Sequence, residues 1–296
     1  MITFFRRRGL GAGSCRGMAR FIDGVPYGTP VSVREYIGTN CSVIRNDREL
    51  SDTDLLVRWG CTSHTSIPLA RQVNTSEAIH FVANKAASRM YLQQHGDGLV
   101  PFTTGAEEEV DRPMVLRPSY HHQGKNLWVV SSAGELNTVL NTYPNVFTDG
   151  WYASELIHKV AEYRVYVASG RVVTVARKTP DDPSQVAWNV AQGGRFDVVP
   201  WGAWPLEACR VAVEAFNLIP GLDFSGVDVM LDGDGRAYVI ELNSAPSLPS
   251  LSDGSVSYRQ KCMARVFKWV EKEGKERMDI KRNQGWAGYI HPAIGG

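Results

Sequence analysis

The stretch GVDVMLDGDGRAYVIELNSAP, residues 226–246, reads as two apolar strands joined by a turn of alternating aspartate and glycine. Asp228 lies within the first strand, and Glu241 and Asn243 lie within the second. If the turn pairs the two strands, Asp228 comes close to Glu241, and Glu241 shares a face with Asn243 because side chains alternate with a period of two. Three oxygen ligands on one face suit Mg²⁺. The pattern therefore predicts a metal-binding hairpin.

A second interpretation of these acids stays open at this point. A carboxylate in an apolar strand is costly unless it is paired or binds a metal, and an ion pair with an arginine would also satisfy it. For any one of these acids, an outward orientation or such a pair is about as good an explanation as a metal. The three residues together, spaced by a hairpin, favour the metal.

Composition limits the class of protein. The 296 residues include 32 Lys+Arg against 31 Asp+Glu, which gives a net charge of +1, and 43% are hydrophobic. This balance is typical of a globular protein and argues against nucleic acid as the primary partner, since nucleic-acid binders carry a basic excess. Five scattered cysteines and the lack of an apolar run of about 20 residues predict a cytoplasmic protein without disulfides or a membrane span.

The remaining chain alternates short strands with amphipathic helices. Hairpin spacing around Ser169-Gly170 predicts strands over 164–168 and 171–176, and helical spacing of apolar residues predicts a helix from Leu206 to Phe216. Ser132 followed by Glu135 predicts a capped helix start. Further expected elements are a strand over 55–59, a helix over 84–96, strands over 114–116 and 127–130, and a last helix from Tyr258 to Trp269. The class is therefore α/β, with α+β elements because antiparallel pairs recur.

The quoted hairpin, continued by Ser244-Ala245-Pro246, resembles the C-terminal signature of ATP-grasp enzymes. The closest similarity is to the ribosomal-protein glutamate ligase (RimK) group and related phage-type ATP-grasp proteins. Other segments are similar to the family in the right order, and the resemblance covers about residues 80–250. It implies an ATP-grasp architecture with a preceding α/β substrate domain over 1–80, a central subdomain over 81–150 and a C-terminal subdomain over 151–296 that carries the metal site and a terminal helix.

The resemblance also implies roles for individual residues. The metal ligands, which would hold ATP-bound Mg²⁺ (two ions, with Mn²⁺ as a substitute), are Asp228, Glu241 and Asn243. The nucleotide-contacting positions are Lys85, Arg117, Gly124, the hinge residues Glu155, Leu156 and Ile157, and Glu162 on the ribose. The residues for phosphoryl transfer are Arg164, Arg177, Lys178 and Asn189.

Arg117 stands where the family usually has lysine. Arginine stays charged and offers a fork of donors, so phosphate binding is compatible with it but with a different geometry. The segment His121-His122-Gln123-Gly124 follows. Adjacent residues of an extended chain point to opposite faces, so the two histidines do not suit one metal, and a polar loop over the triphosphate is the preferred interpretation.

The function that the resemblance implies is an ATP-dependent carboxylate–amine ligase. A substrate carboxylate would be activated as an acyl-phosphate and joined to an amine, giving ADP and phosphate. Two alternatives remain: a kinase that stops at the phosphorylated acceptor, and a nucleotide-binding module without catalysis, which the replaced lysine at Arg117 would favour.

The expected partners are ATP, a small-molecule or peptide carboxylate and an amine acceptor, with no membrane. The oligomeric state stays open, a dimer included. The expected location is the cytoplasm, or the host cytoplasm if the chain is encoded by a phage.

Overall fold

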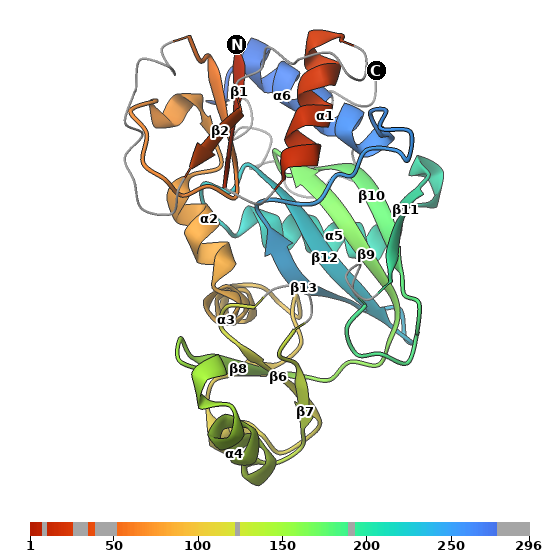
Figure 1. Cartoon of the computed structure of the whole chain (residues 1–296). Helices are drawn as coiled ribbons and strands as arrows, with labels where there is room; N and C mark the ends of the chain where they lie inside the picture. The colour runs from red at the N-terminus through yellow and green to blue at the C-terminus, as the bar shows by residue number, and fades with distance from the viewer. Residues whose placement is uncertain (8–10, 26–34, 39–51, 122–124, 189–192, 277–296) are drawn as a thin grey trace.

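The computed structural model describes residues 1–7, 11–25, 35–38, 52–121, 125–188 and 193–276. Within them the strands form three sheets, which follow one another along the chain (Figure 1). No helix among these residues is long and apolar enough to cross a membrane.

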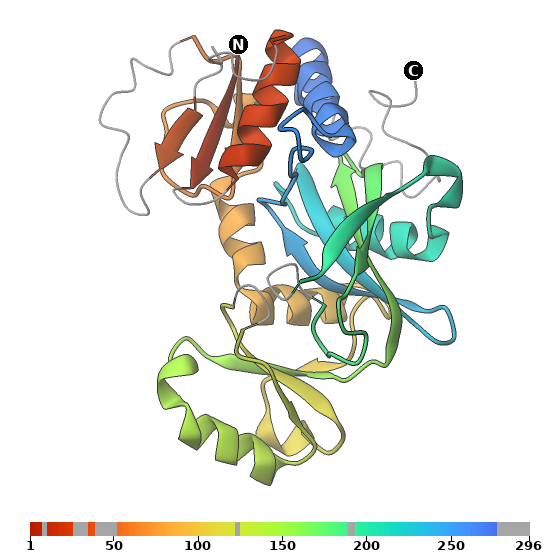
Figure 2. The ribbon, with the colours of Figure 1, turned by 45° about the vertical axis from the view of Figure 1, so that its right-hand side comes forward.

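The N-terminal sheet is parallel and has the order β2-β1-β3-β4. Its strands are β1 (Ile2–Arg7), β2 (Glu35–Gly38), β3 (Leu55–Trp59) and β4 (Gln72–Val73). The helix α1 (Ala12–Asp23) lies beside the last helix of the chain, α6 (Tyr258–Glu273), so the two chain ends share one layer (Figures 1 and 2). Apolar side chains of both helices and of this sheet form one core with residues of the C-terminal sheet.

The central sheet is antiparallel, with the order β5-β8-β6-β7. Its strands are β5 (Thr103–Thr104), β6 (Met114–Pro118), β7 (Trp128–Val130) and β8 (Trp151–Glu155). The accompanying helices are α2 (Ser76–Ala83), α3 (Lys85–His95) and α4 (Ala133–Thr142). Because β8 pairs with β6, this sheet includes residues beyond the boundary predicted at residue 150.

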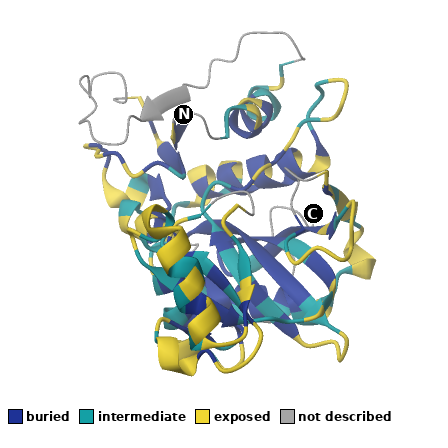
Figure 3. Cartoon of the chain, turned by 60° about the horizontal axis from the view of Figure 1, so that its bottom comes forward, coloured by how far each residue is buried: buried dark blue, intermediate teal, exposed yellow. Residues whose placement is uncertain are grey.

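The C-terminal sheet has five antiparallel strands in the order β11-β10-β9-β12-β13. They are β9 (Lys159–Ala168), β10 (Arg171–Thr179), β11 (Arg195–Val199), β12 (Phe224–Asp232) and β13 (Ala237–Asn243). The helix α5 (Leu206–Asn217) packs on one face through an apolar core. The strands are largely buried (Figure 3). The short 3₁₀ helices elsewhere are Leu69–Arg71, Glu107–Glu109, Pro144–Val146 and Trp201–Ala203.

Several local predictions are confirmed. Both hairpins of the C-terminal sheet form, and Ser169 and Gly170 take the positive φ angles of 53° and 68° that a tight turn requires. The helix expected at 84–96 is α3, which Asn84 caps by accepting a hydrogen bond from the Ala87 amide. Ser132 likewise caps α4 by accepting from the Glu135 amide.

The first 80 residues fold into more structure than the sequence pattern predicted. Only the strand at 55–59 was expected there, whereas β1, α1 and α2 are also present. The cysteines that the structure describes are free and buried, as predicted for Cys209 and Cys262.

Candidate active site

The predicted hairpin brings its three polar residues to one face of the C-terminal sheet. Asp228 on β12 pairs directly with Glu241 on β13, and Gly226 pairs with Asn243. A β-bulge shifts the register between Asp228 and Val229, so Val229 pairs with Val239. Without this bulge, period-two alternation would put Glu241 on the same face as Val239, which packs in the α5 core. The bulge therefore turns Glu241 and Asn243 away from α5.

Asp228 is bound by cations of the neighbouring strands. Arg164 on β9 donates from Nε to Oδ1 at 2.5 Å and from Nη2 to Oδ2 at 2.7 Å. Lys178 on β10 adds a third cation contact, with its Nζ 3.5 Å from Oδ2. Burial alone would lower the pKa of Arg164, but the charge of Asp228 and its hydrogen bonds raise it well above its usual range. The pair is thus fully ionised, and it realises the arginine alternative that the sequence left open.

Glu162 holds two lysines on the same face. Lys159 donates to its Oε2 at 2.6 Å, and Lys178 donates to its Oε1. Burial would lower the pKa of Lys178, but Asp228 and Glu162 raise it. Lys159 also donates to the Val186 carbonyl at 2.9 Å and lies 4.6 Å from the Trp188 ring centroid. Both oxygens of Glu162 are therefore engaged, and the ribose contact proposed for it would have to replace a lysine.

Glu241 lies where the central and C-terminal parts meet. Its Oε2 is 3.4 Å from Lys85 Nζ at the start of α3, and its Oε1 accepts from Asn243 Nδ2 at 3.0 Å. Burial would raise the pKa of Glu241, but the charges of Lys85, His121 and Arg164 and the Asn243 hydrogen bond hold it well below its usual range. Glu241 is therefore an anion throughout the neutral range.

Arg117 at the end of β6 belongs to a second cation group. Its Nη2 lies 2.6 Å from His121 Nδ1, and His121 Nε2 lies 2.9 Å from the Tyr152 hydroxyl. Burial first, and then the charge of Arg117, lowers the pKa of His121 to about 2. The imidazole is therefore neutral, and because arginine only donates, Nδ1 accepts from Arg117 and Nε2 carries the proton towards Tyr152. This network fixes the position of the arginine that replaces the family lysine.

The structure does not bring every predicted residue to this site. Arg177 is exposed and lies on the opposite face from Lys178, because adjacent strand residues alternate. Its predicted role in phosphoryl transfer is therefore not carried forward. Gly124 and Asn189 lie outside the described residues.

The hinge segment is present but partly engaged. The amides of Glu155 and Leu156 donate to the carbonyls of Phe102 and Pro113, at 2.8 and 3.0 Å. These two donors are therefore not free to bind adenine, so a backbone contact by this segment, Ile157 included, would have to use other groups.

The proposed metal ligands were compared with the donor set that Mg²⁺ prefers. Among the described residues, no three His, Cys, Asp or Glu side chains are grouped to hold a metal ion. Asp228, Glu241 and Asn243 offer carboxylate and amide oxygens on adjacent strands, which suits Mg²⁺ when phosphate oxygens complete its coordination. Glu241 and Asn243 already lie together, whereas Asp228 must exchange Arg164 for the metal. With that exchange, the residues present fit the ion.

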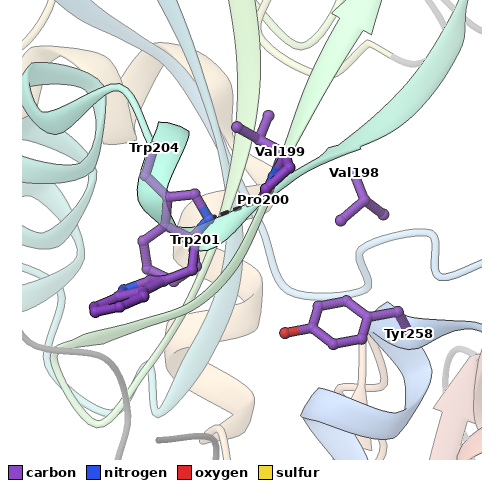
Figure 4. A pocket seen from close by; sticks show the side chains of 6 residues that line it. All are labelled: Val198, Val199, Pro200, Trp201, Trp204 and Tyr258. Carbon is purple, nitrogen blue, oxygen red and sulfur yellow. Dashed lines mark hydrogen bonds between the residues drawn. The ribbon is translucent and has the colours of Figure 1, made fainter.

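An apolar pocket of about 210 Å³ lies away from these charges, at the edge strand β11 (Figure 4). Its lining residues are Val198, Val199, Pro200, Trp201, Trp204 and Tyr258. The indole of Trp204 donates to the Val199 carbonyl at 3.1 Å, while Trp201 is 64% exposed. Trp188 is buried. Packing, which the sequence favoured over a stacking platform for these tryptophans, therefore describes Trp188 and Trp204 but not Trp201.

Sequence reasoning missed three residues of this face. Lys159, Phe196 and Arg89 were not singled out, although Arg89 lies four residues after Lys85 and so on the same side of α3. Phe196 pairs with Lys178 across β11, and its ring centroid lies 4.8 Å from the Arg164 guanidinium. The helical spacing was a usable signal for Arg89, whereas β11 gave no readable pattern.

The three sheets, the clamp-like arrangement and the charged face define the ATP-grasp fold. Residues 127–260 match a family model described as an ATP-grasp domain, the third family of its clade. The predicted resemblance to ATP-grasp proteins is thereby confirmed, while the narrower RimK-like subtype stays a prediction.

Solved structures of ligases share the fold over almost the whole chain. D-alanine–D-alanine ligase from Bacillus anthracis has a TM-score of 0.62 at 14% identity, covering 96% of this chain and 99% of that one. The ATP-grasp ligase PsnB, complexed with a minimal precursor, Mg and ADP, has a TM-score of 0.61 at 14% identity and covers 91% and 97%. D-cycloserine synthetase DcsG has a TM-score of 0.60 at 12% identity and covers 90% and 99%. No curated protein sequence matches this chain.

Proposed function

We propose that this chain is an ATP-dependent ligase that activates a substrate carboxylate as an acyl-phosphate and joins it to an amine. The observation that carries the proposal is the row of Glu241, Asp228 and Arg164 on adjacent strands, flanked by Lys178 and facing Lys85. The row combines oxygen ligands for a metal with cations for phosphate groups. The similarity in fold to three ligases supports the same reaction class.

Each part of the site has a task in this reaction. Lys85 and Arg117 would bind the phosphates of ATP as fixed cations. Arg164 and Lys178 would stabilise the charge of the γ-phosphoryl group as it passes to the substrate carboxylate, and then the tetrahedral intermediate formed when the amine attacks. Mg²⁺ ions, two in number, would bridge Asp228, Glu241 and Asn243 to the phosphates and neutralise charge.

The order of bond changes follows from this chemistry. The carboxylate oxygen attacks the γ-phosphorus and ADP leaves, and the amine then attacks the acyl carbon and phosphate leaves. No covalent enzyme nucleophile takes part. Precursor peptides in the PsnB complexes and amino acids in the names of the other ligases point to an amino acid or a peptide as the substrate class to test first.

The test is ADP release from Mg²⁺-ATP over a matrix of acids and amines, with products analysed by mass spectrometry. We expect release that requires both partners and an amide of the summed mass less water. Release that needs no amine and leaves a stable phosphorylated acceptor would identify a kinase instead. Tight ATP binding without ADP release for any pair would identify a nucleotide-binding module and contradict the proposal.

A further inference from the structure

Two buried arginines differ in how their guanidinium groups are satisfied. Arg58 on β3 is 3% exposed and donates to Gln72 Oε1 and to the carbonyls of Cys61 and Ser63, at 2.6, 3.0 and 2.8 Å. Arg89 on α3 is 7% exposed, yet its Nε and Nη1 atoms are buried without a hydrogen-bond partner. Each lies against one aromatic ring, Arg58 at 5.3 Å and Arg89 at 5.5 Å, the latter on Tyr152. Equal burial therefore coexists with unequal satisfaction.

The surroundings of Arg89 add positive rather than negative charge. Arg117 is close enough for Arg89 to lower its pKa, after the larger effect of burial, and Lys85 precedes Arg89 by one helical turn. The histidine between Arg117 and Tyr152 is neutral, so it supplies no counter-charge. The carboxylate within reach of this group is Glu241, which Lys85 and Arg164 already share.

A buried cation without a carboxylate or a full set of acceptors lowers the stability of a folded protein. Unsatisfied buried donors call for a specific explanation, and unfavourable features of this kind concentrate at ligand-binding sites. The missing partner must be an anion with several acceptor oxygens. It must also lie between α3 and β8, on the same side as Lys85 and Arg117.

We propose that Arg89 is a phosphate-binding residue of the nucleotide site, and that Tyr152 positions it. The free nitrogens of Arg89 would donate to phosphate oxygens from the α3 side, while Arg117 donates from the β6 side. The inference rests on the proposed function only in taking a nucleoside triphosphate as the ligand. It needs neither the acid, nor the amine, nor turnover.

The experiment compares Arg89→Met, Arg89→Lys and, as the matched buried control, Arg58→Met. Isothermal titration measures the Kd of ATP, inorganic tripolyphosphate and adenosine for each protein, and thermal unfolding gives its Tm without ligand. For Arg89→Met we expect ATP and tripolyphosphate to bind about 10- to 100-fold more weakly, because charge-assisted hydrogen bonds are lost. Adenosine should change less than about twofold, and the Tm should stay equal or rise.

The controls separate binding from folding. Arg58→Met should lower the Tm, because three acceptors lose their donor, yet leave the ATP affinity of the folded protein within about twofold. Arg89→Lys keeps the charge but loses the planar group, so its ATP affinity should fall between those of the parent and Arg89→Met.

Three results would overturn the inference. They are unchanged ATP affinity in Arg89→Met, an equal loss for adenosine and ATP, or a large fall in Tm or a failure to fold, either of which would make Arg89 a structural residue like Arg58. If the parent binds neither ATP nor tripolyphosphate, the inference and the ligase proposal both fail. If ATP binds as expected but no acid–amine pair releases ADP, only the ligase proposal fails.

Discussion

The two faces of the C-terminal sheet use the same five strands for opposite purposes. One face carries valines such as Val165, Val227 and Val229, which pack against α5 and are fully buried. The other carries Glu162, Arg164 and other charged residues, also largely buried, whose partners lie on neighbouring strands. The apolar face gains stability from area removed from water, whereas the charged face gains little because desolvation offsets attraction. One face therefore stabilises the fold and the other is arranged for a ligand.

The largest expected effect concerns the apolar face. Phe216 on α5 is fully buried in its core, so Phe216→Ala should lower the free energy of unfolding by about 3–5 kcal/mol. Denaturant unfolding checks this. Nucleotide affinity of the remaining folded protein should not change. If stability stayed the same and ATP binding disappeared, the two faces would not have separate roles.

The next effect concerns the charged face. Glu241→Gln keeps the shape but removes the anion opposite Asp228, and we expect ADP release to fall about 10²- to 10³-fold. The matched control is Glu214→Gln on α5, which loses only a surface ion pair with Arg210. Steady-state kinetics with an active acid–amine pair measures both. Normal turnover by Glu241→Gln would exclude the proposed mechanism.

A smaller effect concerns pH. The pKa of His121 is lowered to about 2 in the folded protein, against about 6.5 in the unfolded chain. Between these values the unfolded state binds the extra proton, so this contribution to stability is full above pH 6.5 and is lost as pH falls, by up to about 1.4 kcal/mol per pH unit. His121→Gln should therefore unfold with a shallower loss of stability between pH 7 and 4.5, measured with denaturant.

Above pH 7.5, the parent and His121→Gln should differ by a constant offset, which serves as the internal control. An unchanged slope below pH 6.5 would show that His121 titrates normally, and its hydrogen bond with Arg117 would then need another explanation.

The smallest effect tests the division of the faces directly. Arg177 is exposed and turned away from the charged cluster, so Arg177→Ala should change stability by less than about 0.5 kcal/mol and ADP release by less than about twofold. Lys178→Met, one residue further on, should lose most of the activity because Lys178 contacts Glu162 and Asp228. Equal losses in the two variants would contradict the assignment of roles to faces.

Local sequence patterns predicted much of this architecture. The hairpin around Asp232–Gly235 and the capped starts of α3 and α4 follow from turn and cap chemistry, which depends on neighbours in the sequence. The N-terminal sheet was missed because parallel strands pair across intervening chain, and the pattern of each strand by itself is weak.

The site was predicted in residue identity more than in arrangement. Asp228, Glu241 and Asn243 do share a face, but the bulge that achieves this was not visible in the sequence, and neither was the pair that Asp228 makes with Arg164. The alternation rule that separates His121 from His122 also separates Arg177 from Lys178, so this part of the arrangement was within reach. Partners from distant strands were not, because their pairing depends on the tertiary fold.

The bulge in the metal-ligand hairpin has a consequence for how the length of this strand can vary. Ile240 is the extra residue of β13, so a chain that lacked it would keep Val239 on the apolar face and Glu241 on the charged face by plain alternation. Loss of Leu242 would instead turn Asn243 into the core. Two neighbouring single-residue deletions should therefore differ sharply in outcome, and position 240 is where a shorter relative of this chain could have lost a residue and kept its ligands.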